Sequence, residues 1–459
     1  MCETQTAGLW RAFPTEGLAG MTTDSNIHVL HPPAPPLAAF LRIGYTGHQK
    51  LEALHAAGRF PYRRAVFDAS HVYQQDGLVR LLKGAGCEIV LDLNFAEAAT
   101  PGRFASAVSK LPWGNPERPW QPSDFSVGTN TNFPELMAKF AVQAGADAVL
   151  APTHVEEGEA TGWHAIDHAF CHHLRAELDR SGGAHIAIDY QLITTARVLK
   201  DSQQLTDVTS GIADLPIQNI WLRASGFGAT ATGAGTRHLI EAARSLHPLG
   251  YPLVIDMAGG FPGLATLAFG VAAGISHGVA QKETFSLSEW RTLPTPQQHG
   301  GVGRRVYVPE LDRYLKEDQF RAFFAIRGTK SRFGCADTSC CRNGIDDMLE
   351  NSHTHFITQR TRQIEDLSRI PEARRAEYFL LHQLDHAIRS SRYAAKLKFA
   401  DEGVQTLVTK AKDRLFRLRD ALGALNEADA GATSRSRALV FRGGSGTKGA
   451  ADALLGKRP

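Results

Sequence analysis

Three cysteines, Cys335, Cys340 and Cys341, lie close together in the second half of the chain. The chain has 6 cysteines in 459 residues and the other three are scattered, so they do not form a disulfide scaffold. Clustered thiols followed by a histidine-rich helical stretch are typical of a tetrahedral zinc site in a reducing compartment. We expect this zinc to be structural, since it would hold together helices that have no large core of their own. The histidines that follow are His353, His355, His382 and His386.

Acidic residues stand where several apolar runs of the sequence end, at Asp68, Asp92, Asp189 and Asp256. Comparable positions after other runs hold His154, Arg223 and His277. One aspartate after a strand is most often a helix cap or a turn residue, and a single histidine is most often satisfied within the fold. Several carboxylates around one opening raise one another's pKa toward the range useful for acid–base chemistry. We therefore expect at least two of these residues to line a pocket.

Glycine-rich segments follow two of the apolar runs. One contains Gly226 and Gly228, and the other contains Gly259 and Gly260. Loops of this kind let backbone N–H groups approach a phosphate, a sugar or the edge of a base. The alternative is that these glycines serve only tight turns and close helix packing.

The elements that must position these residues alternate in type along the chain. Eight apolar runs are separated by helix-like stretches, as expected for parallel strands buried on both faces. An eightfold alternation over about 245 residues predicts a (β/α)8 barrel, whose strand ends open onto one shared face. An open doubly wound sheet is the alternative, but its glycine fingerprint is absent after the first run. The runs are 41–45, 65–68, 88–92, 148–152, 185–189, 219–223, 253–256 and 275–280.

The texture of the sequence divides the chain into four parts. We expect an extended arm over 1–38, the barrel over 39–306, a helical zinc-binding region over 307–430 and a basic flexible tail over 431–459. The overlong segment 95–132 is typical of a functional loop at a barrel mouth.

The overall composition is that of an ordinary globular protein. Lys and Arg number 50 against 47 Asp and Glu, and 43% of the residues are hydrophobic, which excludes wholesale disorder. No apolar run approaches the 18–20 residues, roughly, that span a bilayer, and no basic-then-apolar leader precedes the arm. We expect a cytoplasmic protein with no membrane partner.

The barrel followed by a Cys-Cys-Cys…His group resembles the tRNA-guanine transglycosylase superfamily, including its branch that inserts 7-deazaguanine into DNA. The segment Tyr378–Leu384 is similar to the family's zinc-binding helix, and Arg223–Gly228 is similar to its glycine-rich substrate loop. By this resemblance the zinc ligands are Cys335, Cys340, Cys341 and His382, with His353 or His355 as the alternative fourth ligand. The cysteine spacing departs from the family's, and no acid follows Gly274, where the family carries its nucleophile.

The resemblance implies exchange of a guanine or 7-deazaguanine base in DNA or tRNA, with a covalent glycosyl intermediate. Its candidate catalytic residues are Asp256 as nucleophile and Asp68 as acid or base on the departing base. Asp92 and Asp189 would support the pocket, and Arg223 or His154 would orient sugar or phosphate. Phosphate contacts are expected from the tail and from the arginines at 304, 305, 321, 327, 332, 360 and 362.

Two other functions fit the same residues. One is a catalytically inactive barrel that binds nucleic acid or serves as a scaffold within a multi-protein modification or defence system. A homo-oligomer is compatible with this function. The other is a hydrolase or lyase that uses a catalytic divalent metal on a small substrate. The number of metal ions bound per chain separates this metal-dependent function from base exchange.

Overall fold

Eight parallel strands close into a barrel in the computed structural model, which describes residues 36–125, 132–158, 162–293, 303–429 and 433–444. The barrel closes where β4 pairs with β6. A short strand, β5 (Val155–Glu156), pairs with the C-terminal part of β6. The (β/α)8 fold predicted from the alternating runs is therefore confirmed. The barrel strands are β1 (Ala38–Arg42), β2 (Arg64–Asp68), β3 (Glu88–Asp92), β4 (Ala148–Leu150), β6 (Ala187–Thr195), β7 (Asn219–Ser225), β8 (Leu253–Ile255) and β9 (Gly274–His277).

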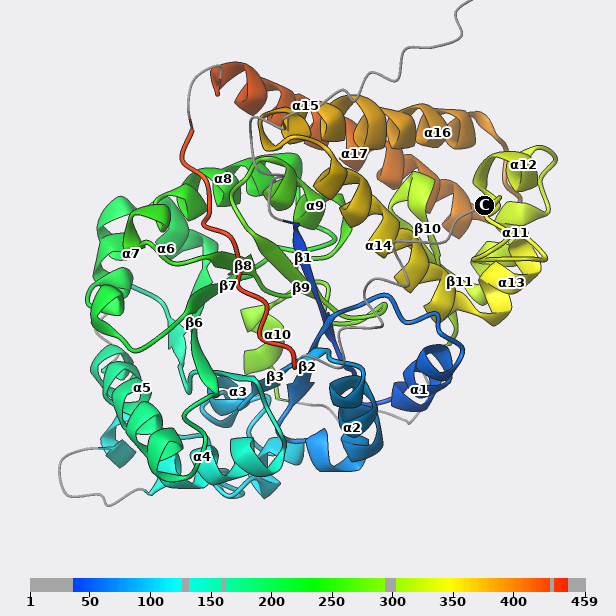
Figure 1. Cartoon of the computed structure of the whole chain (residues 1–459). Coiled ribbons are helices and arrows are strands. Elements are labelled where there is room, and N and C mark those ends of the chain that lie inside the picture. The colour runs from blue at the N-terminus through cyan, green and yellow to red at the C-terminus, as the bar shows by residue number, and fades with distance from the viewer. Residues whose placement is uncertain (1–35, 126–131, 159–161, 294–302, 430–432, 445–459) are drawn as a thin grey trace, which may run out of the picture. The chain divides into compact units, whose positions relative to one another are not determined.

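Helices surround this barrel (Figure 1) and explain why its strands are apolar on both faces. Inside the barrel, Phe40, Val66, Val90 and Trp221 pack together, and the outward-facing residues join a second core shared with the helices. The helices of the barrel are α1 (His48–Ala56), α2 (Asp76–Gly84), α3 (Phe95–Ala98), α4 (Phe133–Gln143), α5 (Trp163–Arg180), α6 (Ala196–Lys200), α7 (Ser202–Thr209), α8 (Gly233–Arg244), α9 (Gly260–Ala268) and α10 (Leu287–Arg291).

Strand β6 differs from its prediction, and the difference moves Asp189. The sequence interpretation ended this strand at Asp189, whereas the strand runs from Ala187 to Thr195, so Asp189 lies near its start. Arg442 bridges Asp189 to Glu88, the first residue of β3. Asp189 therefore lies at the N-terminal end of the barrel, away from the mouth at which we expected it.

The segment 433–444 crosses the N-terminal end of the barrel, in red at the front of Figure 1. The Arg442 guanidinium donates to both carboxylate oxygens of Asp189, at 2.8 and 2.9 Å, and to Glu88 at 2.8 Å. Leu439 packs against the interior cluster, and the Ser436 hydroxyl accepts from the Leu253 amide. The predicted flexible tail is thus wrong for these residues. The rest of the tail, 445–459, and the arm up to residue 35 lie outside the described residues.

We expect Arg442→Ala to lower the free energy of unfolding by about 2–3 kcal/mol, because two fully buried carboxylates lose charge-assisted hydrogen bonds. The loss is limited because Glu88 keeps Arg64, and Asp189 keeps the Asn219 amide and the Trp221 indole. Urea denaturation measures the change. Arg437→Ala on the same segment is the matched control. Equal effects of the two substitutions would contradict the role given to Arg442.

The C-terminal region packs against the barrel and has an apolar core of its own. Phe320, Phe323, Val404 and Val408 belong to this core together with the cysteines of the cluster, which corrects the expectation of helices without one. No helix among the described residues is long and apolar enough to cross a membrane. The elements are the hairpin β10 (Arg305–Val308) and β11 (Arg313–Lys316), then α11 (Glu317–Phe324), α12 (Thr329–Phe333), α13 (Ile345–Glu350), α14 (Ser352–Arg369), α15 (Arg375–Tyr378), α16 (Asp385–Lys396) and α17 (Glu402–Ala428).

Candidate functional site

Two arginines and two aspartates form a buried network inside the barrel, near the C-terminal ends of its strands. Arg42 donates from Nε and one terminal nitrogen to the two oxygens of Asp256, each at 2.7 Å. The other terminal nitrogen of Arg42 donates to Asp92 at 2.9 Å. Arg223 bridges the same two carboxylates, at 2.9 Å to each. The structure thus brings three of the predicted site residues together, and adds Arg42.

These contacts determine the charge of Asp256. Burial alone would raise its pKa, but the positive charges of Arg42 and Arg223 outweigh burial and lower the pKa well below its usual range. One oxygen also accepts from the Met257 amide at 2.9 Å. Asp256 is therefore ionised, and both of its oxygens are occupied. The arrangement suits a fixed counter-ion for the arginines better than the nucleophile we expected at this position.

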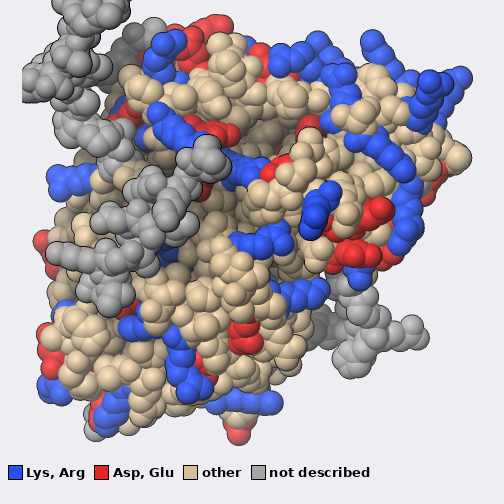
Figure 2. Space-filling model, turned by 45° about the vertical axis from the view of Figure 1, so that its right-hand side comes forward, with Lys and Arg blue, Asp and Glu red and all other residues tan. Residues whose placement is uncertain are grey.

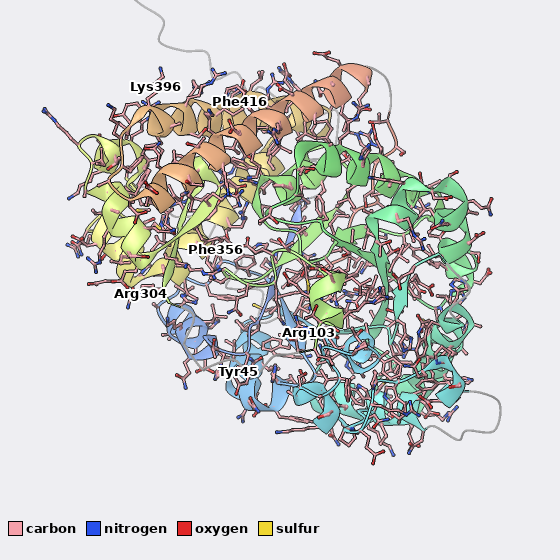
Figure 3. All side chains as sticks on the ribbon, turned by 180° about the vertical axis from the view of Figure 1, so that it is seen from behind. Tyr45, Arg103, Arg304, Phe356, Lys396 and Phe416 are labelled. Carbon is pink, nitrogen blue, oxygen red and sulfur yellow. The ribbon has the colours of Figure 1, made fainter. Side chains whose placement is uncertain are left out.

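Above the network, the segment after β9 closes the centre of the mouth. Phe285 and Trp290 pack over the Arg223 guanidinium, with 5.9 and 5.6 Å between its carbon and the ring centroids. Figure 3 views this side, and the labelled Arg103 lies beside the short helix α10, consistent with its contact to Trp290. The overlong segment 95–132 contributes here, since the Gly102 amide donates to the Trp290 carbonyl.

Two further acids lie at the mouth, and one of them, Asp68, is 3.7 Å from Arg42 of the network. Asp68 ends β2 and forms an ion pair with Lys282, and its side chain is part-exposed. Glu97, on α3, is half-buried, and one of its oxygens has no hydrogen-bond partner among the described residues. Burial and the charge of Asp92 raise the pKa of Glu97 to about 7. Glu97 was missed in the sequence because it lies inside a short helix rather than after an apolar run.

A cavity of about 760 Å³ lies beside this mouth, between the barrel loops and the C-terminal region. The loops after β7, β8 and β9 supply one wall, and the hairpin β10–β11, α14 and α17 supply the others. Its volume is within the range of small-molecule sites, and it opens on the face where barrel enzymes bind their ligands. Lys282, the partner of Asp68, lines it as well.

Two buried acids line this cavity, Glu283 and Asp312, and only Asp312 forms a close ion pair, with Arg414 at 2.7 Å. Glu283 Oε1 lies 4.0 Å from Arg360 and has no hydrogen-bond partner among the described residues. Burial raises the pKa of Glu283 to about 7, against the opposing charge of Arg360 and a hydrogen bond from Tyr314. Arg360 itself is fully buried and donates to the Tyr307 hydroxyl at 3.2 Å. Arg360 therefore shapes the cavity wall and is not the surface phosphate contact that we expected.

The glycine loops take part in this wall in different ways. Gly260 lines the cavity, and its φ of 65° together with the close approach of Asp312 excludes a side chain there. At Gly259 and Gly228 a Cβ would collide with Glu283, so both glycines make room for the segment that carries this acid. Gly226 also has a positive φ, but nothing lies within 4 Å of a Cβ placed on it. Three of the four predicted glycines thus contact the cavity or its acid.

The two predicted histidines lie apart from the cavity and have partners of their own. His154 Nδ1 bonds to Asp167 at 2.5 Å, and its ring stacks on Trp163 at 3.5 Å. His277 is buried and bonds to the Tyr62 hydroxyl through Nε2, at 3.2 Å. Burial and the charge of Arg360 lower the pKa of His277 to about 3, so it is neutral. His277 thus matches the alternative of a histidine satisfied within the fold.

The three clustered cysteines meet one histidine, and that histidine is His355. The sulfurs of Cys340 and Cys341 are 3.7 Å apart, and they lie 3.6 and 3.4 Å from His355 Nδ1. With Cys335, these form the one group of potential metal ligands among the described residues whose donor atoms all lie within 4.8 Å of one another. Tetrahedral zinc with Zn–S bonds of about 2.3 Å separates sulfurs by about 3.8 Å, so the geometry fits a Cys3His zinc site.

The hydrogen bond on the far side of His355 also fits metal binding. Its Nε2 lies 3.1 Å from the Tyr307 carbonyl oxygen, which accepts the ring proton and leaves a lone pair on Nδ1 toward the sulfurs. His382 lies elsewhere, stacked on Tyr378, so the fourth ligand expected from the resemblance is corrected to His355. A bound zinc would hold the segment 335–341 against the start of α14, where His355 in turn bonds to the Tyr307 carbonyl of β10. It would thereby fix Tyr307, which also lines the cavity.

Comparison with known proteins identifies neither a family nor an activity for this chain. No family model matches this chain, and no curated protein matches it. A modular endo-β-1,4-mannanase from Cellulomonas fimi is 12% identical, with a TM-score of 0.36 over 56% of this chain and 70% of that chain. A GH26 β-mannanase from Bacteroides ovatus is 10% identical, with a TM-score of 0.34 over 58% and 85%. KGPDC from Streptococcus mutans is 12% identical, with a TM-score of 0.28 over 56% and 94%. The chain is similar to barrel enzymes of different activities, and its own fold assignment rests on the closed order of its eight strands.

Proposed function

We propose that the cavity beside the barrel mouth binds a guanine-type base, guanine or 7-deazaguanine, of a nucleic acid. The observation that carries this proposal is Glu283, a buried carboxylate of the cavity lining, one of whose oxygens has no hydrogen-bond partner among the described residues. The Watson–Crick edge of guanine offers an N–H and an amino group side by side, and a carboxylate accepts both at once. Adenine offers a lone pair in place of the ring N–H, which a carboxylate repels.

The rim of the cavity suits the phosphates that accompany such a base. Arg305, Arg313 and Lys410 line it, and the ring of Tyr314 supplies an aromatic wall. Figure 2, which brings the C-terminal region toward the viewer, shows Lys and Arg side chains spread over that region. These cations neutralise a phosphate backbone, and the enclosed carboxylate then reads the base that is turned into the cavity.

A second cavity, on the other side of the mouth, favours a nucleic-acid strand over a free base as the ligand. It measures about 860 Å³, and Arg103, Lys110 and Lys139 line it, with no carboxylate among its described lining residues. Tyr45 and Tyr73 stand in its wall with 60% and 56% of their surface exposed. Exposed aromatic rings beside cations are typical of grooves that hold unpaired nucleotides.

Exchange of the bound base is the second candidate function, and the part-exposed Asp68 favours it. Asp68 lies at the edge of the arginine network, 3.7 Å from Arg42, and its side chain is more exposed than those of Asp92 and Asp256. Its partner Lys282 lines the cavity of Glu283. In this function Asp68 attacks the sugar carbon C1′, the C1′–N bond breaks, and the base leaves with the bonding electrons and takes a proton from Lys282. Recognition without exchange leaves Asp68 unmodified.

We expect guanine to bind with a dissociation constant that improves as the pH rises through about 7, because Glu283 must lose its proton before it can accept two N–H groups. Calorimetric titration between pH 6 and 8 measures this, with adenine and hypoxanthine as competitors. Glu283→Gln should weaken guanine binding about 10- to 100-fold, as expected for lost hydrogen bonds to a charged group, and should flatten the pH dependence.

Glu310→Gln is the matched control, since burial likewise raises the pKa of Glu310 to about 7 but the residue does not line the cavity. Equal binding of adenine and guanine, or a wild-type pH profile in Glu283→Gln, would refute base recognition by this carboxylate. Mass spectrometry after incubation with guanine-containing RNA or DNA separates the two candidate functions. Base exchange should add the mass of the glycosyl group to Asp68, and recognition alone should leave Asp68 unmodified.

A further inference from the structure

A second group of potential metal ligands lies at the barrel mouth, on the far side from the cysteines. It consists of Glu156 at the end of β5 and of His164 and His168 on α5. The two histidines are four residues apart, which places them on one face of the helix, as in zinc-binding helices. Glu156 is 4% exposed and belongs to a different element, so the group joins two parts of the mouth.

The donor atoms of this group are buried and make no hydrogen bond. Glu156 Oε1, His164 Nδ1 and His168 Nε2 have no hydrogen-bond partner among the described residues. Glu156 Oε1 and His164 Nδ1 form an ion pair at 3.8 Å, which is too long for a hydrogen bond and close to twice a metal–ligand distance of about 2.1 Å. Buried ligand atoms without a hydrogen bond require an explanation, and a bound ion is one.

The surrounding contacts orient the two imidazoles for this task. In its neutral form His164 donates from Nε2 to the Ser210 carbonyl at 3.1 Å and keeps a lone pair on Nδ1. The Glu156 carboxylate raises the pKa of His164, so a bound ion takes the place of a proton on Nδ1. The His164 and His168 rings lie 4.2 Å apart between centroids. Gly211, with a φ of 71°, contacts the His168 ring edge, and a side chain there would collide with it. The three donor atoms do not all lie within 4.8 Å of one another, so His168 must turn its ring, and it gives up no Nε2 hydrogen bond in doing so.

We propose that Glu156, His164 and His168 bind a divalent transition-metal ion such as Zn²⁺, separate from the Cys3His site. Two imidazoles and one carboxylate are ligands that suit zinc, iron and nickel and disfavour Mg²⁺ and Ca²⁺. The His164 side chain is 32% exposed, so a further coordination position faces solvent and water completes the shell. The ion fixes the end of β5 to the first turns of α5. This proposal does not depend on base recognition.

The test counts zinc ions on the full chain. After equilibrium dialysis against micromolar Zn²⁺, native mass spectrometry of the wild-type protein should give two zinc ions per chain. The double substitution H164A/H168A should leave one, and cobalt loading of that variant should keep the thiolate-to-metal absorption of the cysteine site. H172A/H173A removes two histidines from the same helix as a matched control and should keep both ions.

One ion on the wild-type chain, two on H164A/H168A, or the same loss in the H172A/H173A control would overturn the second site. Thermal unfolding of the metal-free variants shows whether they are folded. Should H164A/H168A not fold, Glu156→Gln removes the carboxylate charge without shortening the side chain, and it should also leave one ion.

Discussion

Replacing Cys341 with serine is expected to remove the bound zinc and to unfold the C-terminal helices. Cys341 is 2% exposed and its sulfur lies 3.4 Å from His355 Nδ1 and 3.7 Å from the Cys340 sulfur, so its loss breaks the tetrahedral donor set. Structural zinc contributes about 10–16 kcal/mol in zinc-finger peptides, comparable to the whole stability of a domain. Circular dichroism and zinc analysis of the purified variant measure the two effects together.

Cys171→Ala is the control for this prediction, because Cys171 is a buried free cysteine of α5 outside the cluster. The Cys171→Ala variant should keep the Cys3His zinc, and its free energy of unfolding should fall only by the small amount expected for a minor truncation in the core. His382→Ala should also keep the zinc, whereas His355→Ala should not. Zinc retained in His355→Ala and lost in His382→Ala would restore the ligand set that the resemblance implies.

Replacing Arg42 with methionine should destabilise the barrel by about 3–5 kcal/mol, the cost of leaving a buried charge without its partner. In the native chain two guanidinium groups balance the two carboxylates of Asp92 and Asp256, all of them buried. With Arg42 gone, Arg223 alone faces both acids, and the network keeps an uncompensated negative charge. Chemical denaturation monitored by tryptophan fluorescence measures the change.

The double substitution Arg42→Met with Asp256→Leu tests the charge balance directly. It leaves Arg223 paired with Asp92, at 2.9 Å, and the network neutral again. The double variant should therefore be more stable than Arg42→Met alone, although it removes more native contacts. Additive losses from the two substitutions would mean that packing, and not charge, accounts for the effect.

The sequence could predict the barrel because its strands are buried on both faces. Continuous apolar runs identify such strands, and all eight were found, although β1 begins three residues earlier than its run and β6 ends six residues later. The β6 strand was cut short because a charged Asp189 looks like the end of a buried strand. The charge is tolerated inside the barrel because the distant Arg442 pairs with it and the Asn219 amide and the Trp221 indole donate to it.

The site was harder to predict because its geometry depends on contacts between distant elements. Asp92, Arg223 and Asp256 could be placed together, since strand ends of a barrel share one face. Glu283 and Glu97 could not be identified from the sequence, because their pKa values are raised by the burial that the finished fold imposes. The choice between His355 and His382 depends on where two helices lie in space, which their spacing from the cysteines does not reveal.

The closure of the barrel base by Arg442 has a consequence for how the chain folds during synthesis. The contact between Glu88 and Arg442 joins residues 354 positions apart. At about 5–20 residues per second, a ribosome needs roughly 20–70 s to make the intervening chain. Until then Glu88 has only Arg64 as its cation, and Asp189 has only its neutral partners, so the nascent barrel stays less stable than the finished one. The barrel therefore reaches its full stability only after the segment that carries Arg442 has been made, long after its strands.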